Sequence, residues 1–271
     1  MSNFYLFSRV NIYMSLRNIY LKNKKKKTFK NSLRKKSPPK NKLVSKLNSE
    51  SNSRNPQGKQ IFFVHIGKTA GTTLETIFNH YKLYYNNIHC EKPPYHSNYK
   101  YIISIRDPLS QTISAFNWRY HLLVNKNHWK SFSPEYEYEK EILKKYKNIN
   151  NISERLYHKN GKANTSVHQE LREIYHIKLG TSYYLKDLLS HLQSSQIIAV
   201  ITTENLEQDL QDHLHMSSKN IKTNHMSSSK HHYSTYLSEL GRKNLRKFLD
   251  CDYTCLAKLK TLFDYSLLDK K

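Results

Sequence analysis

Three short apolar runs constrain the fold of this chain more than any other feature. They are IFFVHI at residues 61–66, YIISI at 101–105 and IIAVIT at 197–202. Each is rich in β-branched and aromatic residues and too short for a buried helix, so each predicts a strand covered on both faces. Because segments of helical periodicity separate the runs, we expect an α/β fold in three layers, with a central parallel sheet flanked by helices.

The segments that follow these runs have apolar residues at helical spacing. Leu74, Ile77 and Phe78 lie on one face of a helix after the first run, and Pro108 is suited to the first turn of a second helix. The interval between the first two runs is long enough to return a neighbouring parallel strand, and a short strand is expected before His89. The expected helices are 71–82, 109–123, 135–147, 168–176, 183–193, one starting near 203–204, 235–250 and 253–265.

Positive charge is concentrated at the beginning of the chain. The 271 residues include 45 Lys and Arg against 21 Asp and Glu, a net charge of +24. Residues 1–59 contain 16 of these basic residues and a single acid, Glu50. Residues 22–59 have too few apolar side chains to offset the entropy of ordering. We therefore expect a disordered basic tail or linker over 1–59 and a folded domain over 60–271.

The basicity of the tail has two interpretations that stay open. One is attraction to a polyanion, such as an anionic polysaccharide, a lipid surface or a nucleic acid. The other is coding bias, because Lys, Asn, Ile and Tyr are abundant, as in translations of AT-rich DNA. Residues 4–21 are too polar to span a membrane, since Arg9 and Arg17 interrupt them, but a peripheral membrane contact of this segment is a further alternative.

The pattern of cysteines and the absence of an apolar span bear on the cellular compartment of the protein. The three cysteines, Cys90, Cys251 and Cys255, have no regular spacing and predict neither a disulfide framework nor a zinc site. A reduced compartment fits this pattern. We expect a cytoplasmic protein with no transmembrane segment, and the missing anchor favours a bacterial or viral source.

The loop after the first run, GKTAGTT at 67–73, has the composition of an anion site. A helix that begins just past Gly71 directs unpaired N–H groups and its positive dipole end toward the loop. Gly67 and Gly71 are expected to permit unusual dihedral angles and close approach of the backbone. Lys68 adds a positive charge, and threonine hydroxyls add donors. The order of residues differs from an ATP-binding Walker loop, in which the lysine follows the second glycine.

A second loop follows the second run. In YIISIRDPLSQTISAFNWR, Arg106 stands at the end of the expected strand, where its guanidinium can bind a phosphate through two N–H groups. Ser114 is eight residues further, about two turns into the next helix. An alternative reading of Arg106 and Asp107 alone is a simple capping pair at a helix start. Both loops follow the carboxyl end of a strand, where open α/β sheets bind ligands.

Together these loops resemble the nucleotide-binding motifs of sulfotransferases that use 3′-phosphoadenosine 5′-phosphosulfate. HIGKTAGTT is similar to the "hIpKTaGTs" loop of the carbohydrate-directed branch, with Gly67 where proline is usual. RDPLSQTISAF is similar to the "RdPxxRxxSxy" motif, with Gln111 in place of a frequent arginine. More loosely, 201–210 resembles a late strand–helix element and 222–230 a loop over the 3′-phosphate. The resemblance covers about 60–265 and implies a P-loop-like fold.

The resemblance also implies a reaction and a set of site residues. The donor would be 3′-phosphoadenosine 5′-phosphosulfate, no metal would be required, and a sulfuryl group would move to a hydroxyl or amine. Lys68 would stabilise charge on the bridging oxygen, and Arg106 and Ser114 would hold the 3′-phosphate. The expected set that binds the donor is Gly67, Lys68, Thr69, Ala70, Gly71, Thr72, Thr73, Arg106 and Ser114.

A general base is expected because a sugar hydroxyl is a weak nucleophile. In relatives it lies between the two motifs, and that interval offers His80, His89, Glu91 and His96. We favour His89, then His96. His65, inside the first strand, is better explained as a packed histidine with a satisfied hydrogen bond.

The spelling of the motifs and the abundance of aromatic residues favour a carbohydrate acceptor, and no specific nucleic acid is expected. Trp118 and Trp129 belong to the aromatic residues near the second helix. Two other functions stay open at this stage. One is a small-molecule kinase of the P-loop class, and the other is a non-catalytic polyanion-binding protein that acts through the basic tail.

Overall fold

The computed structural model describes residues 41–51, 59–126, 134–219, 221 and 234–267. Within them the chain forms an α/β fold around a four-stranded sheet in which every pairing is parallel, in the order β2-β1-β3-β4. The three apolar runs become strands β1 (Gln60–His65), β3 (Tyr99–Ile105) and β4 (Ile197–Thr202). The short β2 (Asn86–Ile88) is the edge strand that precedes His89. The expectation of a parallel sheet flanked by helices is confirmed.

The helices lie in the expected segments with shifted bounds, except that no helix was expected at 42–50 or 149–153. They are α2 (Lys42–Glu50), α3 (Gly71–His80), α4 (Pro108–Tyr120), α5 (Pro134–Tyr146), α6 (Ile149–Ser153), α7 (Thr165–Glu173), α8 (Tyr175–Lys178), α9 (Thr181–Leu188), α10 (Leu206–Leu214), α11 (Glu239–Phe248) and α12 (Asp250–Leu262). A π-helical turn η1 (His121–Asn125) extends α4, and a 3-10 turn η2 (Ser194–Gln196) precedes β4.

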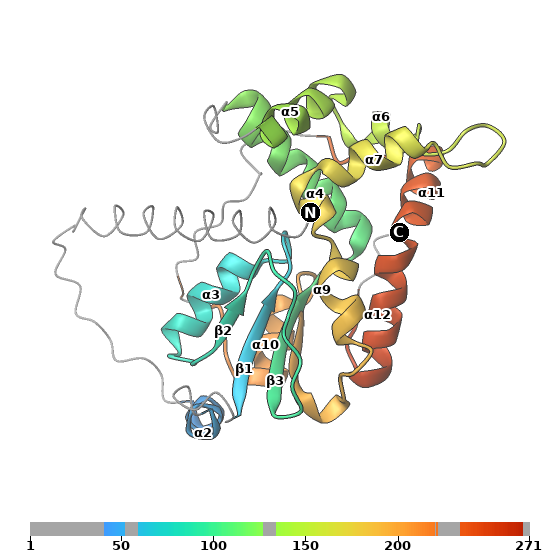
Figure 1. Cartoon of the computed structure of the whole chain (residues 1–271). Helices are drawn as coiled ribbons and strands as arrows, with labels where there is room; N and C mark the ends of the chain where they lie inside the picture. The colour runs from blue at the N-terminus through green and yellow to red at the C-terminus, as the bar shows by residue number, and fades with distance from the viewer. Residues whose placement is uncertain (1–40, 52–58, 127–133, 220, 222–233, 268–271) are drawn as a thin grey trace, which may run out of the picture. The chain divides into compact units, whose positions relative to one another are not determined.

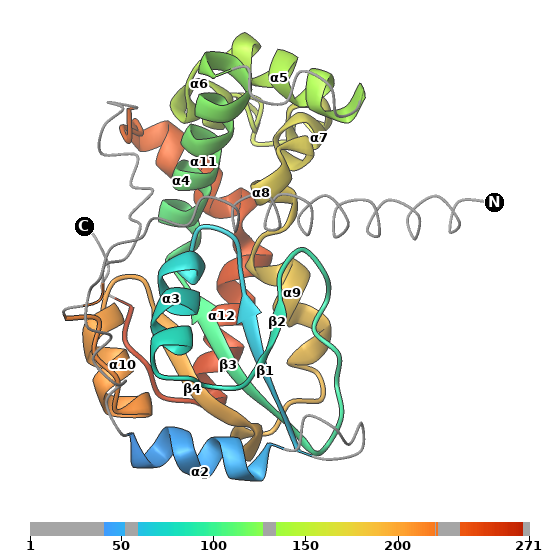
Figure 2. The same ribbon diagram turned by 90° about the vertical axis from the view of Figure 1, so that its left-hand side faces the viewer.

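Two apolar cores lie on the two faces of the sheet, and Figures 1 and 2 show the helices that cover these faces. Phe62 and Val64 of β1 belong to the core that contains α9 and α12. Ile61 and Phe63 belong to the opposite core, which contains α3 and α10. This alternation follows from the two-residue period of a strand, and burial of each such side chain contributes about 1.5–3 kcal/mol. The sheet is therefore the middle of three layers.

A third apolar core joins helices beyond the carboxyl ends of the strands. It unites buried side chains of α4, α5, α6, α7, α8 and α11. In Figure 1 these helices lie past the arrowhead of β1, on the same side as the loop that connects β1 to α3. The helical region therefore borders the edge of the sheet where a ligand site is expected.

The strand order places a topological switch point between β1 and β3. From β1 the chain passes through α3 to β2 on one side, and then returns across β1 to β3 on the other side. The neighbouring placement of 61–66 and 101–105 is confirmed, with Val64 opposite Ile103 in the register. The carboxyl ends at such a point diverge into opposite layers and leave a crevice.

Two helices differ from the sequence-based expectation. Residues 42–50, which were assigned to a disordered linker, form α2, with Val44 buried in the sheet core and Asn41 capping the helix. Asn41 Nδ2 also donates to the carbonyl oxygens of Leu214 and His215, so contacts to the folded domain stabilise this helix. Figure 2 shows α2 across the end of the sheet where the strands begin. The rest of 1–59 lies outside the described residues, apart from 41, 51 and 59.

The helix expected at 168–176 is divided. Ile174 has an extended backbone with ψ 113°, so α7 ends at Glu173 and the separate turn α8 begins at Tyr175. The side chain of Ile174 is fully buried, so packing fixes this break in direction. The break brings His176 to the region of the first loop.

No helix among the described residues is long and apolar enough to cross a membrane.

Candidate functional site

The first loop joins β1 to α3 and has two non-glycine residues with left-handed backbone. Lys68 has φ 69° and Ala70 has φ 61°, whereas Thr69 between them has no positive φ. A backbone that alternates in this way directs successive N–H groups toward one point and forms a concavity for anions. In the described part of the chain, the N–H groups of Gly71 and Thr72 have no hydrogen-bond acceptor. The loop therefore has the backbone of an anion site.

The glycines of this loop are needed for space and not for dihedral freedom, so that expectation was wrong. Neither Gly67 nor Gly71 has a positive φ. A Cβ on Gly71 would lie 1.9 Å from Cδ2 and Nε2 of His65. A Cβ on Gly67 would lie 2.8 Å from Cδ2 of His176. The glycines thus allow two imidazole rings to pack directly against the loop.

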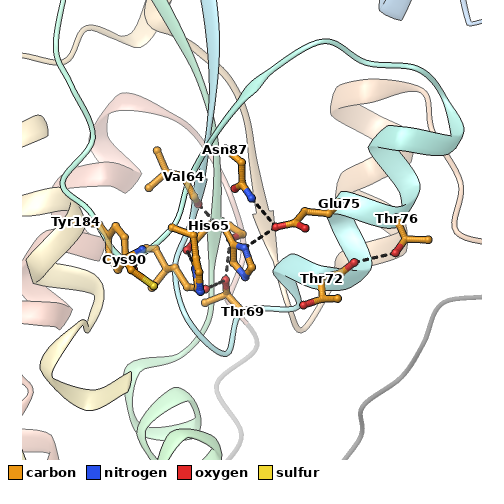
Figure 3. Close-up of polar contacts among 12 residues, drawn as sticks. Val64, His65, Thr69, Thr72, Glu75, Thr76, Asn87, Cys90 and Tyr184 are labelled. Atoms are coloured by element: carbon orange, nitrogen blue, oxygen red, sulfur yellow. Dashed lines mark hydrogen bonds and ion pairs between the residues drawn. The ribbon is translucent and has the colours of Figure 1, made fainter. Parts of the chain in front are cut away.

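The hydroxyl of Thr69 has a structural partner. It is buried, donates to the carbonyl oxygen of Ile66 at 2.7 Å and lies 2.7 Å from Ser104 Oγ on β3 (Figure 3). This hydroxyl, expected to face the ligand, instead ties the loop to the neighbouring strand. The accessible hydroxyls of the loop are those of Thr72, which is exposed, and Thr73, which is half-buried.

Lys68 lies at the centre of the site. Its ammonium group is 4.7 Å from the ring centroid of Trp118 on α4, which is a cation–π distance. Burial, and second the charge of Arg106, lower the pKa of Lys68 to about 8. Both effects disfavour the charged form and would be relieved by a bound anion. Trp129 lies outside the described residues.

The second loop begins with Arg106 at the end of β3. Its Nη1 lies 3.5 Å from the carbonyl oxygen of Lys68, and its Nε lies 3.8 Å from Glu204 Oε1, just past β4. The distance from Nε to Glu204 Oε1 is too long for a hydrogen bond. The buried Nε therefore has no hydrogen-bond partner among the described residues. Burial lowers the pKa of Arg106 and raises the pKa of Glu204, despite their mutual attraction. The guanidinium thus retains an unfilled donor.

The two loops are joined by Gln111 of α4. Its Nε2 donates to the carbonyl oxygen of Gly67 at 2.9 Å, and its Oε1 accepts from Thr181 Oγ1 at 3.1 Å. The residue that departs from the sulfotransferase pattern is therefore buried and fully engaged within the protein. The contacts of Gln111 and Arg106 to the first loop show that the two loops meet at the switch point, where open α/β sheets have their ligand crevice.

The other residues of the second motif have separate roles. Asp107 caps α4, since its Oδ1 accepts from Ser110 N at 2.8 Å, and its Oδ2 accepts from Tyr253 OH at 2.9 Å. The capping reading of Asp107 is thus correct, while Arg106 faces the first loop. Ser114 is half-buried on α4, and its hydroxyl has no hydrogen bond to the described residues. The loop expected at 222–230 lies outside the described residues.

His89, the favoured base, lies beside the first loop. It follows β2, and its ring stacks on His65 with centroids 4.2 Å apart. His89 Nδ1 is 3.0 Å from the carbonyl oxygen of His65. A carbonyl can only accept, so Nδ1 of His89 carries a proton and the neutral ring has its lone pair on Nε2. This is the tautomer that a general base needs at Nε2.

His65 is a packed histidine with a satisfied hydrogen bond, as the sequence suggested. It is buried, and its Nδ1 lies 3.0 Å from Glu75 Oε1 (Figure 3). Asn87 Nδ2 donates to the same carboxylate oxygen at 2.6 Å. Glu75 thus links α3, β1 and β2 below the loop and fixes the ring on which His89 stacks.

The structure places His96, the second candidate for the base, away from both loops. It is exposed and lies just before β3, where its carbonyl oxygen accepts from Gln196 Nε2 at 2.9 Å. Arg106 follows the other end of the same seven-residue strand. At about 3.3 Å per residue the two ends are roughly 20 Å apart. A loop that crosses from β2 back to the start of β3 carries His96 away from the site.

Sequence reasoning missed His176. Its ring is half-buried against Gly67, and burial, followed by the charges of Arg119 and Lys68, lowers its pKa well below the usual value. It lies outside the interval between the two motifs and is one of 15 histidines. No local sequence pattern identifies His176 as a site residue. It reaches the first loop only because the chain changes direction at Ile174.

Comparisons with models of known protein families, with curated proteins and with solved structures found no match. Among the described residues, no group of three or more His, Cys, Asp or Glu side chains has the arrangement of a metal site.

Proposed function

We propose that this protein transfers a sulfuryl group from 3′-phosphoadenosine 5′-phosphosulfate to a hydroxyl of a carbohydrate, on a sheet of the P-loop-like class. One observation carries the proposal: two loops with the composition of anion sites meet across the switch point. Gln111 Nε2 lies 2.9 Å from the Gly67 carbonyl oxygen, and Arg106 Nη1 lies 3.5 Å from that of Lys68. A nucleotide with phosphates at both its 3′ and 5′ positions needs two such loops.

The residues at the crevice fit a nucleotide with an anionic group at each end. The N–H groups of Gly71 and Thr72 and the ammonium of Lys68 suit the 5′ end. Arg106, whose side chain is partly exposed and whose Nη1 lies beside the first loop, suits the 3′-phosphate. Ser114 faces no other partner there and supplies a hydroxyl for the same group.

Three side chains of the site have roles in the proposed reaction. The bound donor supplies an activated sulfur, whose bond to the 5′-phosphate oxygen breaks as the acceptor oxygen bonds to it. Lys68 in its protonated form stabilises the charge that develops on the departing oxygen. His89 takes the proton of the acceptor hydroxyl on Nε2, while its Nδ1–H stays on the His65 carbonyl oxygen. Trp118, half-buried beside Lys68, offers an aromatic face to a sugar ring.

Nucleotide binding tests the proposal directly. Calorimetry on the full chain should show that adenosine 3′,5′-bisphosphate binds more tightly than adenosine 5′-monophosphate. Arg106→Ala should remove most of this difference, by about tenfold or more, because a charge-assisted contact to the 3′-phosphate is lost. Arg242→Ala, which removes an exposed arginine of α11, is the matched control and should leave both affinities unchanged.

The same experiment separates the alternatives. Binding of ATP with magnesium, with no affinity for the bisphosphate, would support the kinase instead. Salt-dependent binding of anionic polymers that survives Lys68→Ala and is lost without residues 1–40, which precede α2 and its cap, would support the polyanion-binding alternative. A screen of polysaccharides with labelled donor identifies the acceptor, and Lys68→Ala should abolish transfer in a folded protein.

A further inference from the structure

One side chain at the crevice is not explained by packing. His176 of α8 presses Cδ2 against Gly67, and its Nδ1 is enclosed with no hydrogen-bond partner among the described residues. A polar atom buried without a partner lowers stability, and most such atoms in proteins are paired. Leu or Met would fill this position without that cost. A histidine here is therefore explained better by what its other nitrogen does.

The enclosed nitrogen determines the tautomer of the ring. His176 Nδ1 has either a lone pair or an N–H in surroundings that offer neither a donor nor an acceptor in the described part of the chain. Orphaned buried N–H groups are rarer in proteins than under-satisfied acceptors. We therefore assign the lone pair to Nδ1 and the proton to Nε2. Nε2 is not among the enclosed atoms without a partner and, next to Cδ2, lies beside Gly67.

The charges around the ring keep it neutral. Burial lowers the pKa of His176 well below its usual value, and the charges of Arg119 and Lys68 lower it further. A neutral imidazole with its proton on Nε2 can donate a hydrogen bond without becoming a second cation. A histidine with a depressed pKa can thus act as a neutral electrophile toward an oxygen that gains charge.

A buried ion pair binds the backbone just before His176. Arg119 binds Glu139 through two contacts, Nε to Oε1 at 2.6 Å and Nη2 to Oε2 at 2.5 Å. Glu139 Oε1 also accepts from the backbone N–H of Tyr175, the residue before His176, at 3.2 Å. This contact fixes the start of α8 and hence the approach of the ring to the loop.

We infer that His176 donates a hydrogen bond from Nε2 to an oxygen of the transferred sulfuryl group, while His89 is the proton acceptor. The inference rests on the proposed function and adds to it a second histidine with the opposite tautomer. His89 has Nδ1–H on a carbonyl and a lone pair on Nε2, whereas His176 has a lone pair on Nδ1 and a proton on Nε2. The different surroundings of the two rings thus make His176 the hydrogen-bond donor and His89 the acceptor at one site.

Binding of two nucleotides that differ only in the sulfuryl group tests this role. 3′-Phosphoadenosine 5′-phosphosulfate and adenosine 3′,5′-bisphosphate are titrated into the wild-type full chain and three variants. His176→Gln keeps a neutral N–H donor near the Nε2 position, and His176→Met fills the volume without one. The matched control is His168→Met, because His168 is also half-buried with an orphaned Nε2, but packs between Tyr157 and Phe248.

We expect a loss of affinity for one of the two nucleotides, in one of the three variants. His176→Met should weaken the sulfuryl-carrying nucleotide by about tenfold and leave the bisphosphate unchanged, which is the effect of one hydrogen bond to a charged group. His176→Gln and His168→Met should match the wild type. With an acceptor present, His176→Gln should keep the pH dependence of kcat, which His89→Gln should remove.

Other outcomes overturn the inference, and they differ from a failure of the proposed function. Equal losses for both nucleotides in His176→Met, or no loss for either, reduce His176 to a packing residue. A His176→Gln variant as weak as His176→Met shows that the ring and not its N–H is needed. A wild-type chain that binds neither nucleotide overturns the proposed function together with this inference.

Discussion

Gln111 Nε2 donates a hydrogen bond of 2.9 Å to the carbonyl oxygen of Gly67, and this contact connects two loops that follow different strands. The amide is buried and also accepts from Thr181 Oγ1, so one side chain joins β1, α4 and α9. The glutamine that replaces the frequent arginine of the sulfotransferase pattern therefore holds the first loop in place.

Gln111→Met should lower the free energy of unfolding and also weaken nucleotide binding. The substitution keeps the volume but leaves the Gly67 carbonyl and the Thr181 hydroxyl without their partner, at a cost of about 1–3 kcal/mol. Chemical denaturation measures the stability, and calorimetry with adenosine 3′,5′-bisphosphate measures binding. Gln208→Met, which removes an exposed amide that contacts Asp212, is the control and should change neither. An unchanged affinity in Gln111→Met would show that the loop is held without this contact.

Gly71→Ala should destabilise the protein through contact with one particular ring. The added Cβ would lie 1.9 Å from Cδ2 and Nε2 of His65, and overpacking of this severity costs about 2 kcal/mol or more. In a His65→Ala background the same substitution should cost much less, because the space is vacated. A double-mutant cycle by thermal and chemical unfolding measures the difference.

Gly161→Ala is the comparison for this cycle. Gly161 has φ 78° and no atom within 4 Å of an added Cβ, so its cost of about 1–2 kcal/mol comes from the backbone alone. That cost should be the same with or without His65. Equal costs of Gly71→Ala in both backgrounds would contradict the contact.

Binding of adenosine 3′,5′-bisphosphate should weaken as the pH rises above neutrality. Burial first, then Arg106, lowers the pKa of Lys68 to about 8, and we expect the anion to bind the protonated amine. A bound nucleotide would raise this pKa, so affinity should be full near pH 7 and fall by about tenfold by pH 9. Lys68→Arg stays charged throughout and should bind with no such slope. A wild-type affinity that is flat over this range would rule out an uncharged Lys68 near pH 8.

Glu139→Leu should destabilise the protein strongly, and a second substitution should restore much of the loss. Arg119 and Glu139 are both almost fully buried, so removal of the carboxylate leaves a desolvated charge, at a cost of about 3–5 kcal/mol. Arg119→Met combined with Glu139→Leu replaces the pair with apolar groups and should recover most of the stability. Chemical denaturation of the single and double variants measures both effects.

The exposed pair Lys144 and Glu141 is the control for the buried one. Their side chains are largely in water, so Glu141→Leu should not change the unfolding midpoint measurably. A loss as large as that of Glu139→Leu would show that charge count, and not burial, determines the effect. The double variant also tests the position of α8, since the Tyr175 N–H loses its acceptor.

The sheet and both loops could be predicted from short stretches of sequence. The strand over 197–202 was located at its observed bounds, and the pairing of β1 with β3 followed from the length of chain between them. These predictions succeed because burial on two faces leaves a local apolar signature. The bounds of helices were less certain, as the break at Ile174 shows, since helical periodicity continues across it.

The roles of particular loop residues depended on contacts that no local pattern contains. The sequence indicates that the Thr69 hydroxyl is a donor to the ligand. In the structure this hydroxyl instead contacts the Ile66 carbonyl oxygen and the Ser104 hydroxyl. Gly71 looked like a dihedral requirement, and it is a contact surface for His65. Residues 42–50 looked too polar to fold, yet Val44 reaches the sheet core.

The sequence by itself determined the α/β class, the parallel strands and the presence of two basic loops at strand ends, because periodicity and turn chemistry are local properties. Only the tertiary structure decided which histidines meet at the crevice. It brought His89 and His176 to one loop and took His96 to the far end of β3. The physical reason is that a side chain's neighbours are set by the packing of segments distant in sequence, which buries one nitrogen of His176 and leaves the other beside Gly67.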